Sequence, residues 1–131
     1  KEKGVFVTLS DAEKPNFIEV VNKYVELDFS IYATEGTASF LKENKIESII
    51  VGRADDESPT SLTIIEEKLI SIVINTPTFA NEYTDGWKIR RLSHETGVAV
   101  VSSVREAEAF LEAFLLQDKV LDDMEAIQNV S

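Results

Sequence analysis

Apolar residues follow two alternating patterns along this chain. Short runs of β-branched and aliphatic residues are typical of strands, and they are separated by stretches in which apolar residues recur every three or four positions, which is typical of amphipathic helices. These patterns predict strands over residues 4–9, 29–33, 47–51, 71–75 and 98–101, and helices over residues 15–25, 37–44, 59–69, 86–95 and 104–115. The chain therefore alternates strand and helix throughout.

Local signals mark several helix ends. Ser58-Pro59 suits an N-cap followed by the first helical residue. Gly97 follows the fourth predicted helix and suits its C-cap. Ser103 and Glu106 have the spacing of a capping box before the last helix.

Five strands that alternate with helices through short loops predict one fold class. Parallel strands need crossover helices, and such connections place helices on both faces of the sheet. The unbroken apolar run at 71–75 suits a central strand buried on both faces. We therefore expect an α/β fold, a doubly wound three-layer α/β/α arrangement with a five-stranded parallel sheet.

In such a sheet, ligands bind at the carboxyl ends of the strands. Four polar turns follow the first four predicted strands and should gather at that edge: residues 10–14, 34–37, 53–58 and 75–78.

The length of 131 residues suits one domain, which we place at residues 1–116. Residues 117–131 are acidic and only weakly amphipathic, so they are expected to form an acidic tail or a short helix. The chain does not begin with methionine and enters a strand almost at once, which suggests a domain of a longer polypeptide.

Composition narrows the function classes. The formal charge of −11 argues against nucleic-acid binding, which requires a basic surface. No cysteine and a single histidine argue against a metal site. No apolar run approaches the roughly 20 residues of a membrane helix, so we expect no membrane partner and a cytoplasmic location.

The turn at Thr34, Gly36 and Thr37 allows two interpretations. It lies at the start of a predicted helix, where free N–H groups favour an anion and the threonine hydroxyls can add donors. Alternatively, Thr34 or Thr37 caps the helix, which requires no ligand and is the commoner role of such residues. Asn75, after a buried strand, adds a side chain that both donates and accepts.

Four segments together resemble a known family. They are GVFVTLSDAEKP, ATEGTASFL, IVINTP and DGWKIRRLSHETGVAVVSS. In this order and spacing the chain resembles the methylglyoxal-synthase-like (MGS-like) domain, most closely the C-terminal allosteric domain of the carbamoyl-phosphate synthetase large subunit. The resemblance covers residues 4 to 116.

The resemblance implies strand order 3-2-1-4-5 and a regulatory function. Domains of this family bind small effectors such as UMP or IMP and modulate ATP-dependent carbamoyl phosphate synthesis, which serves pyrimidine and arginine biosynthesis. It implies no catalysis and no cofactor in this domain itself. The implied partners are the effector, the remaining domains of the large chain and its glutaminase small subunit, and a homo-oligomer is a further alternative.

The resemblance also implies the effector-binding residues, which are Lys14, Thr34, Thr37, Arg53, Asn75, Thr76 and Thr78. One departure is the acidic run 55–57, which stands where relatives carry His-Glu-Gly before an arginine. Its three carboxylates would repel a nucleotide phosphate, so a vestigial effector site in a domain kept for structure or oligomerisation is the alternative.

A methylglyoxal-synthase-type lyase is a third alternative. That enzyme carries catalytic aspartates after its third and fourth strands, and here the fourth predicted strand runs into Asn75-Thr76-Pro77. Without a carboxylate placed as general base, proton abstraction has no agent. We therefore expect no catalytic residues.

Overall fold

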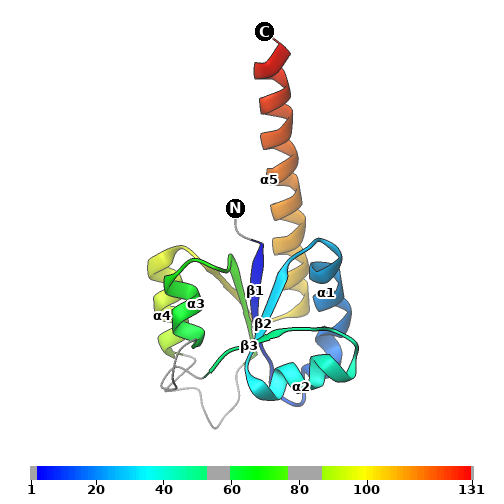
Figure 1. Ribbon diagram of the computed structural model, residues 1–131, viewed down its shortest axis with the longest axis vertical. Coiled ribbons are helices and arrows are strands. Elements are labelled where there is room, and N and C mark those ends of the chain that lie inside the picture. Colours follow the sequence, from blue (N-terminus) through cyan, green and yellow to red (C-terminus); the bar gives the residue numbers. More distant parts are fainter. Residues whose placement is uncertain (1–2, 53–59, 77–86, 131) are drawn as a thin grey trace.

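The protein forms a five-stranded parallel sheet covered by helices on both faces (Figure 1). The computed structural model describes residues 3–52, 60–76 and 87–130. Strand order is β3-β2-β1-β4-β5, and every pairing between neighbours is parallel. The predicted fold class and strand order are confirmed.

The centre of the sheet is formed by β1 and its two neighbouring strands. β1 (Gly4–Thr8) lies between β2 (Ser30–Ala33) and β4 (Ile72–Asn75). The edge strands are β3 (Ile49–Ile50) and β5 (Ala99–Val101). All residues of β4 are buried, as expected for a central parallel strand.

Alternate residues of β1 point to two separate hydrophobic cores. Val5 and Val7 belong to the core that packs α1 (Lys14–Glu26), α2 (Glu35–Glu43) and α5 (Val104–Val130) against the sheet. Phe6 belongs to the core on the opposite face.

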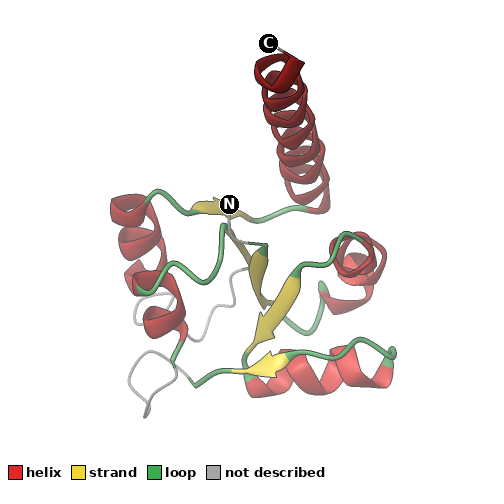
Figure 2. Ribbon diagram, turned by 45° about the horizontal axis from the view of Figure 1, so that its top comes forward, coloured by secondary structure: helices red, strands yellow, loops and turns green. Residues whose placement is uncertain are grey.

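That second core is covered by α3 (Ser61–Glu66) and α4 (Trp87–Thr96). Figure 2 shows the two helical layers on either side of the strands.

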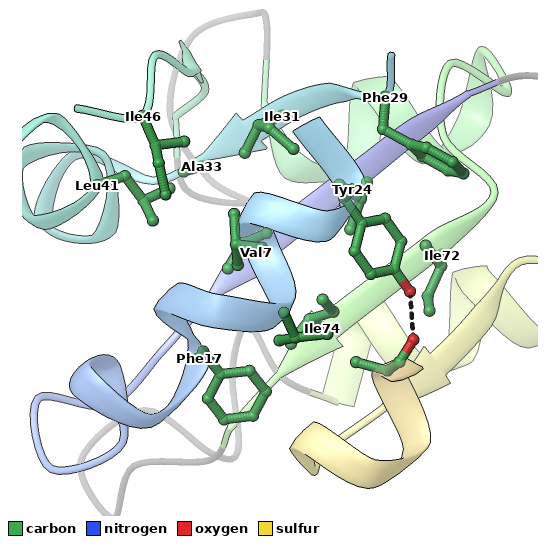
Figure 3. Packing of buried hydrophobic residues seen from close by; sticks show 14 of the residues in the cluster. Val7, Phe17, Tyr24, Phe29, Ile31, Ala33, Leu41, Ile46, Ile72 and Ile74 are labelled. Carbon is green, nitrogen blue, oxygen red and sulfur yellow. Dashed lines mark hydrogen bonds between the residues drawn. The ribbon is translucent and has the colours of Figure 1, made fainter. Parts of the chain in front are cut away.

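Aromatic side chains join α1 to α5, and Figure 3 shows two of them, Tyr24 and Phe29. The rings of Tyr24, Phe29 and Phe114 meet edge to face, with centroid distances of 5.0 and 5.1 Å. The Tyr24 hydroxyl donates to the carbonyl of Ala107 at 2.7 Å. Its burial raises the pKa of Tyr24, so this hydroxyl stays protonated and serves as a structural donor.

Two predicted helix boundaries are confirmed. Gly97 has φ of +78°, and Val98 donates its N–H to the carbonyl of Ser93 at 2.8 Å, so the turn after α4 uses glycine as expected. Before α5, the Ser103 Oγ accepts from the N–H of Glu106 at 3.1 Å and donates to its carboxylate at 3.0 Å.

Other boundaries were predicted wrongly. The N-cap of α3 is Thr60 rather than Ser58, because the Thr60 Oγ1 accepts from the N–H of Thr63 at 3.2 Å. The predicted strand at 47–51 keeps only Ile49 and Ile50, which are 49% and 59% exposed at the edge of the sheet.

The C-terminal segment is helical. α5 continues from Val104 to Val130 and extends well beyond the sheet (Figure 1). A division of the chain at residue 117 stays a prediction. Within the described ranges, none of the helices combines the length and apolarity needed to cross a membrane.

Candidate functional site

Three strands bring the predicted polar residues to one edge of the sheet. Thr8, the last residue of β1, lies opposite Asn75, the last residue of β4, and Val7 lies opposite Ala33 of β2. The residues that follow these strands, Leu9, Thr34 and Thr76, therefore meet at the carboxyl edge.

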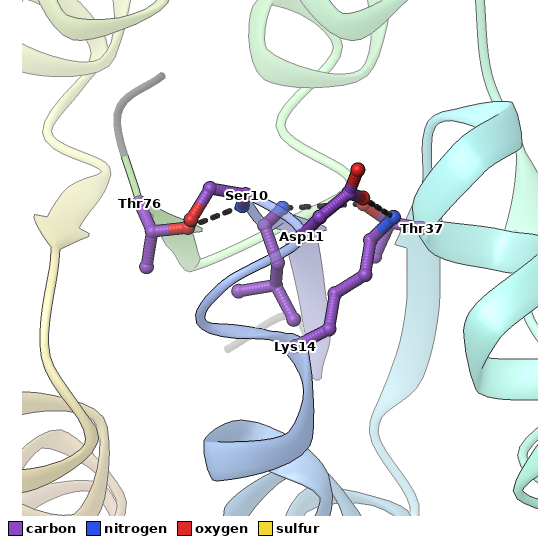
Figure 4. Close-up of polar contacts among 6 residues, drawn as sticks. Ser10, Asp11, Lys14, Thr37 and Thr76 are labelled. Carbon is purple, nitrogen blue, oxygen red and sulfur yellow. Dashed lines mark hydrogen bonds and ion pairs between the residues drawn. The ribbon is translucent and has the colours of Figure 1, made fainter. Parts of the chain in front are cut away.

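The turn after β1 is hydrogen-bonded to α2 on one side and to Thr76, which follows β4, on the other (Figure 4). The N–H of Leu9 donates to the Thr37 Oγ1 at 3.2 Å, and the N–H of Ser10 donates to the Thr76 Oγ1 at 2.7 Å. Thr37 and Thr76 are 2% and 5% exposed. Two of the predicted effector-binding residues thus hold the turn in place.

These bonds leave donor capacity on both hydroxyls. A threonine hydroxyl has one hydrogen to donate besides the lone pairs that accept. Because the oxygens of Thr37 and Thr76 accept from backbone N–H groups, their own hydrogens remain to be directed elsewhere. Both side chains can therefore be structural and still contact a ligand.

The N-terminus of α2 is not capped by a threonine side chain. Thr34 stands at the N-cap with extended backbone, but its side chain makes no capping hydrogen bond. Thr37 lies inside the helix and bonds Leu9. Thr34 therefore holds the expected N-cap position, but without the side-chain hydrogen bond of a cap, and the N–H groups of residues 35–37 lack intrahelical acceptors.

Lys14 approaches that same helix end. Its Nζ lies 3.9 Å from the place where a Cβ on Gly36 would be, and its side chain is 15% exposed. The ammonium pairs with the Asp11 carboxylate at 2.6 Å, and Asp11 is 95% exposed. The hydrogen bond from Lys14, and then its charge, lowers the pKa of Asp11.

The position of Lys14 adds a positive charge to the N-terminus of α2, which is itself electropositive. A helix N-terminus behaves as a partial positive charge, so a cation beside it is unfavourable unless an anion joins them. Asp11 supplies one anion to Lys14, and Glu35 lies in the first turn of α2. The arrangement is suited to a phosphate or similar anion bound by backbone N–H groups and an ammonium.

The remaining predicted site residues divide into two groups. Asn75 is 7% exposed and lies beside Thr76, and its side chain forms no hydrogen bond within the described part of the chain. Arg53 and Thr78, together with the acidic run 55–57, lie outside the described residues. Lys14, Thr34, Thr37, Asn75 and Thr76 are brought to the same edge.

No metal centre is found among residues 3–52, 60–76 and 87–130, where histidine and carboxylate side chains nowhere gather in threes.

Two features of the site were not predicted from the sequence. The bonds from Leu9 to Thr37 and from Ser10 to Thr76 join residues 28 and 66 positions apart, and no local signal announces them. The pairing of Asp11 with Lys14 has the spacing of i and i+3 across the start of α1, so it could have been predicted.

A family model describing the MGS-like domain matches residues 16–102. The matched range contains Thr34, Thr37, Asn75 and Thr76, whereas Lys14 lies just before it.

Curated relatives match most of the chain. It is 40% identical over 112 residues to the carbamoyl phosphate synthase large chain of Lachnoclostridium phytofermentans, which covers 85% of this chain and 10% of that protein. The C-terminal sections of this large chain from Methanocaldococcus jannaschii and Aquifex aeolicus are each 35% identical. The alignments cover 84% and 86% of this chain, and 18% and 21% of those proteins. The chain thus spans between about a tenth and a fifth of their length.

A solved structure has the same fold. Methylglyoxal synthase from Elizabethkingia anophelis superposes with a TM-score of 0.61, and the match covers 84% of this chain and 76% of that one. The sequences are 14% identical, so this likeness concerns the fold alone.

Proposed function

Because the chain belongs to the MGS-like domain family, we propose that it is the regulatory domain of a carbamoyl phosphate synthase large chain and binds a small phosphorylated effector, such as UMP or IMP. The effector binds at the carboxyl edge of the sheet. The domain performs no catalysis itself. It modulates carbamoyl phosphate synthesis in the remaining domains of the large chain, which acts with a glutaminase small subunit.

One observation carries this proposal. The Lys14 ammonium lies beside the N-terminus of α2, where the side chain of the N-cap residue Thr34 makes no capping hydrogen bond. A cation beside a helix N-terminus is electrostatically unfavourable, so the placement of Lys14 does not stabilise α2. A phosphate group would accept hydrogen bonds from both the ammonium and the first N–H groups of the helix.

The other residues of the site have distinct functions in the proposal. The Thr34 and Thr37 hydroxyls add donors to the phosphate, and Asn75 and Thr76 contact the ribose or base of the effector. Arg53 and Thr78 complete the set, with Arg53 providing a second cation. Thr37 and Thr76 also fix the turn that carries Lys14, so the site and the fold share two side chains.

Substituting Lys14→Met tests the site directly. Methionine keeps an apolar stem in this largely enclosed position but removes the ammonium. A charge-assisted hydrogen bond contributes about 1.5–3 kcal/mol. Titration calorimetry should therefore show UMP, IMP or inorganic phosphate binding weakened by roughly 10- to 150-fold.

A matched control is Lys42→Met, which removes a lysine from the last turn of the same helix, α2. This variant should bind as the unmodified protein does. Equal binding by Lys14→Met and the unmodified protein would place the effector elsewhere.

The vestigial alternative has its own supporting observation, because Thr37 and Thr76 already have structural hydrogen bonds. It predicts no calorimetric response to phosphorylated ligands at millimolar concentration. The lyase alternative predicts methylglyoxal formation from dihydroxyacetone phosphate, and our proposal predicts none.

A further inference from the structure

Asp11 forms an ion pair with Lys14, the cation of the proposed site. It lies in the turn between β1 and α1, and its Oδ1 is 2.6 Å from the Lys14 Nζ (Figure 4). The two partners differ in surroundings, because Lys14 is 15% exposed and Asp11 is 95% exposed. The Lys14 ammonium thus belongs to a largely buried side chain, whereas the Asp11 carboxylate is exposed and can turn toward solvent.

The ion pair does little for the fold. Asp11 does not cap α1, whose N-cap residue is Glu13, and the N–H groups of Glu13 and Lys14 bond the carbonyl of Ser10. An exposed pair at i and i+3 contributes little to stability. The ion pair matters more for anion binding, because the Asp11 carboxylate and a bound anion compete for the same Lys14 ammonium.

We propose that Asp11 is a built-in competitor for the anion site, an inference that rests on the proposed function. In the unliganded domain its carboxylate holds the Lys14 ammonium, and an incoming phosphate displaces it. Asp11 therefore lowers the affinity for the effector and raises the concentration at which the domain responds. It does so without contacting the effector, because it acts through Lys14.

The pair can be tested without any ligand. NMR titration of the Asp11 carboxyl should give a pKa below the ordinary aspartate value in the unmodified protein. In Lys14→Met that pKa should return to the ordinary value. An ordinary pKa for Asp11 in the unmodified protein would overturn the proposal.

Asp11→Asn should strengthen binding. The amide keeps the size of the side chain but competes weakly for the ammonium. The affinity for inorganic phosphate and for UMP should rise by roughly two- to fivefold, the range expected from releasing an exposed ion pair. Glu13→Gln is the matched control, because it removes one charge from the same turn and Glu13 bonds Asn16 rather than Lys14.

The double variant separates displacement from general charge. If Asp11 acts through Lys14, the gain from Asp11→Asn disappears in the Lys14→Met background. A gain that persists there, or that Glu13→Gln reproduces in full, would overturn the competitor function.

The two proposals fail in different ways. If Lys14→Met binds phosphate as the unmodified protein does, the site itself is wrong. If Lys14→Met loses binding while Asp11→Asn binds as the unmodified protein does, only the competitor function is wrong.

Discussion

Gly36 is a glycine that the backbone does not require. It lies in the first turn of α2, and among the described residues an added Cβ would meet only the Lys14 Nζ, at an ordinary contact distance of 3.9 Å. Gly4 differs, because a Cβ there would lie 2.1 Å from the carbonyl oxygen of Leu69. Gly4 is needed for packing, whereas Gly36 leaves open the space between Lys14 and the N-terminus of α2.

Gly36→Ala should therefore separate stability from binding. Alanine is the better helix former by up to about 1 kcal/mol, so urea denaturation should show unchanged or raised stability. The added methyl group enters the space in which the phosphate would lie, so calorimetry should show weaker UMP and phosphate binding. Unimpaired binding by this variant would contradict the proposed position of the anion.

Gly97→Ala is the opposite control. Gly97 has φ of +78°, so alanine there should lower the free energy of unfolding by about 1–2 kcal/mol. Effector binding should not change, because this turn follows α4 and is not part of the proposed site.

Individual residues of the site were partly predictable. The polar side chains Thr34, Thr37, Asn75 and Thr76 stood out because they follow predicted strands. The hydrogen-bond partner of Thr37 could not be predicted in the same way. Its partner Leu9 comes close to it only because β1 pairs with β2. Long-range contacts of this kind depend on the register of the sheet, which one sequence does not specify.

At the scale of elements, α1 and α5 are joined by polar as well as aromatic contacts. Besides the Tyr24 hydroxyl on the carbonyl of Ala107, the Lys23 ammonium pairs with the Glu108 carboxylate at 2.6 Å. The hydrogen bond to Glu108, and then its charge, raises the pKa of Lys23. The buried hydrogen bond of Tyr24 should contribute more than the partly exposed ion pair.

Tyr24→Phe tests that contribution. It removes one buried hydrogen bond and keeps the ring, so the free energy of unfolding should fall by about 0.5–1.5 kcal/mol in urea denaturation. Tyr32→Phe is the matched control, because the Tyr32 hydroxyl has no hydrogen bond within the described part of the chain. Equal losses for the two variants would mean that the Ala107 contact contributes nothing specific.

Element types were easier to predict than element ends. Gly97 and the pair Ser103 and Glu106 carry conformational or hydrogen-bonding signals of their own, and both predicted ends are confirmed. The start of α3 was missed because Ser58 and Thr60 are both good caps, and only the geometry of the chain selects Thr60. The short β3 reflects its position at the sheet edge, which its apolar run does not reveal.

For the whole molecule, alternation of strands and helices was enough to predict a parallel sheet. It was not enough to predict the order of the strands, which was expected only from the family resemblance and is confirmed. That order matters for the proposed site, because it places the carboxyl ends of β1, β2 and β4 side by side.

The net charge of −11 means that the protein as a whole repels an anionic effector. Long-range repulsion of an anionic effector is screened beyond the Debye length of about 8 Å at physiological ionic strength. Within that range, the local potential depends on Lys14 and the N-terminus of α2, and on the nearby carboxylates of Asp11 and Glu35. Anion binding by this acidic domain must therefore be local.

The most direct test is an NMR titration of the isotope-labelled protein with UMP, IMP and inorganic phosphate, following the backbone amide signals. We expect the largest shifts at residues 35–37 and in the turn 9–14, and we expect Lys14→Met to require much higher ligand concentrations to produce them. Amide signals that do not move, or shifts concentrated away from the N-terminus of α2, would contradict the proposed site.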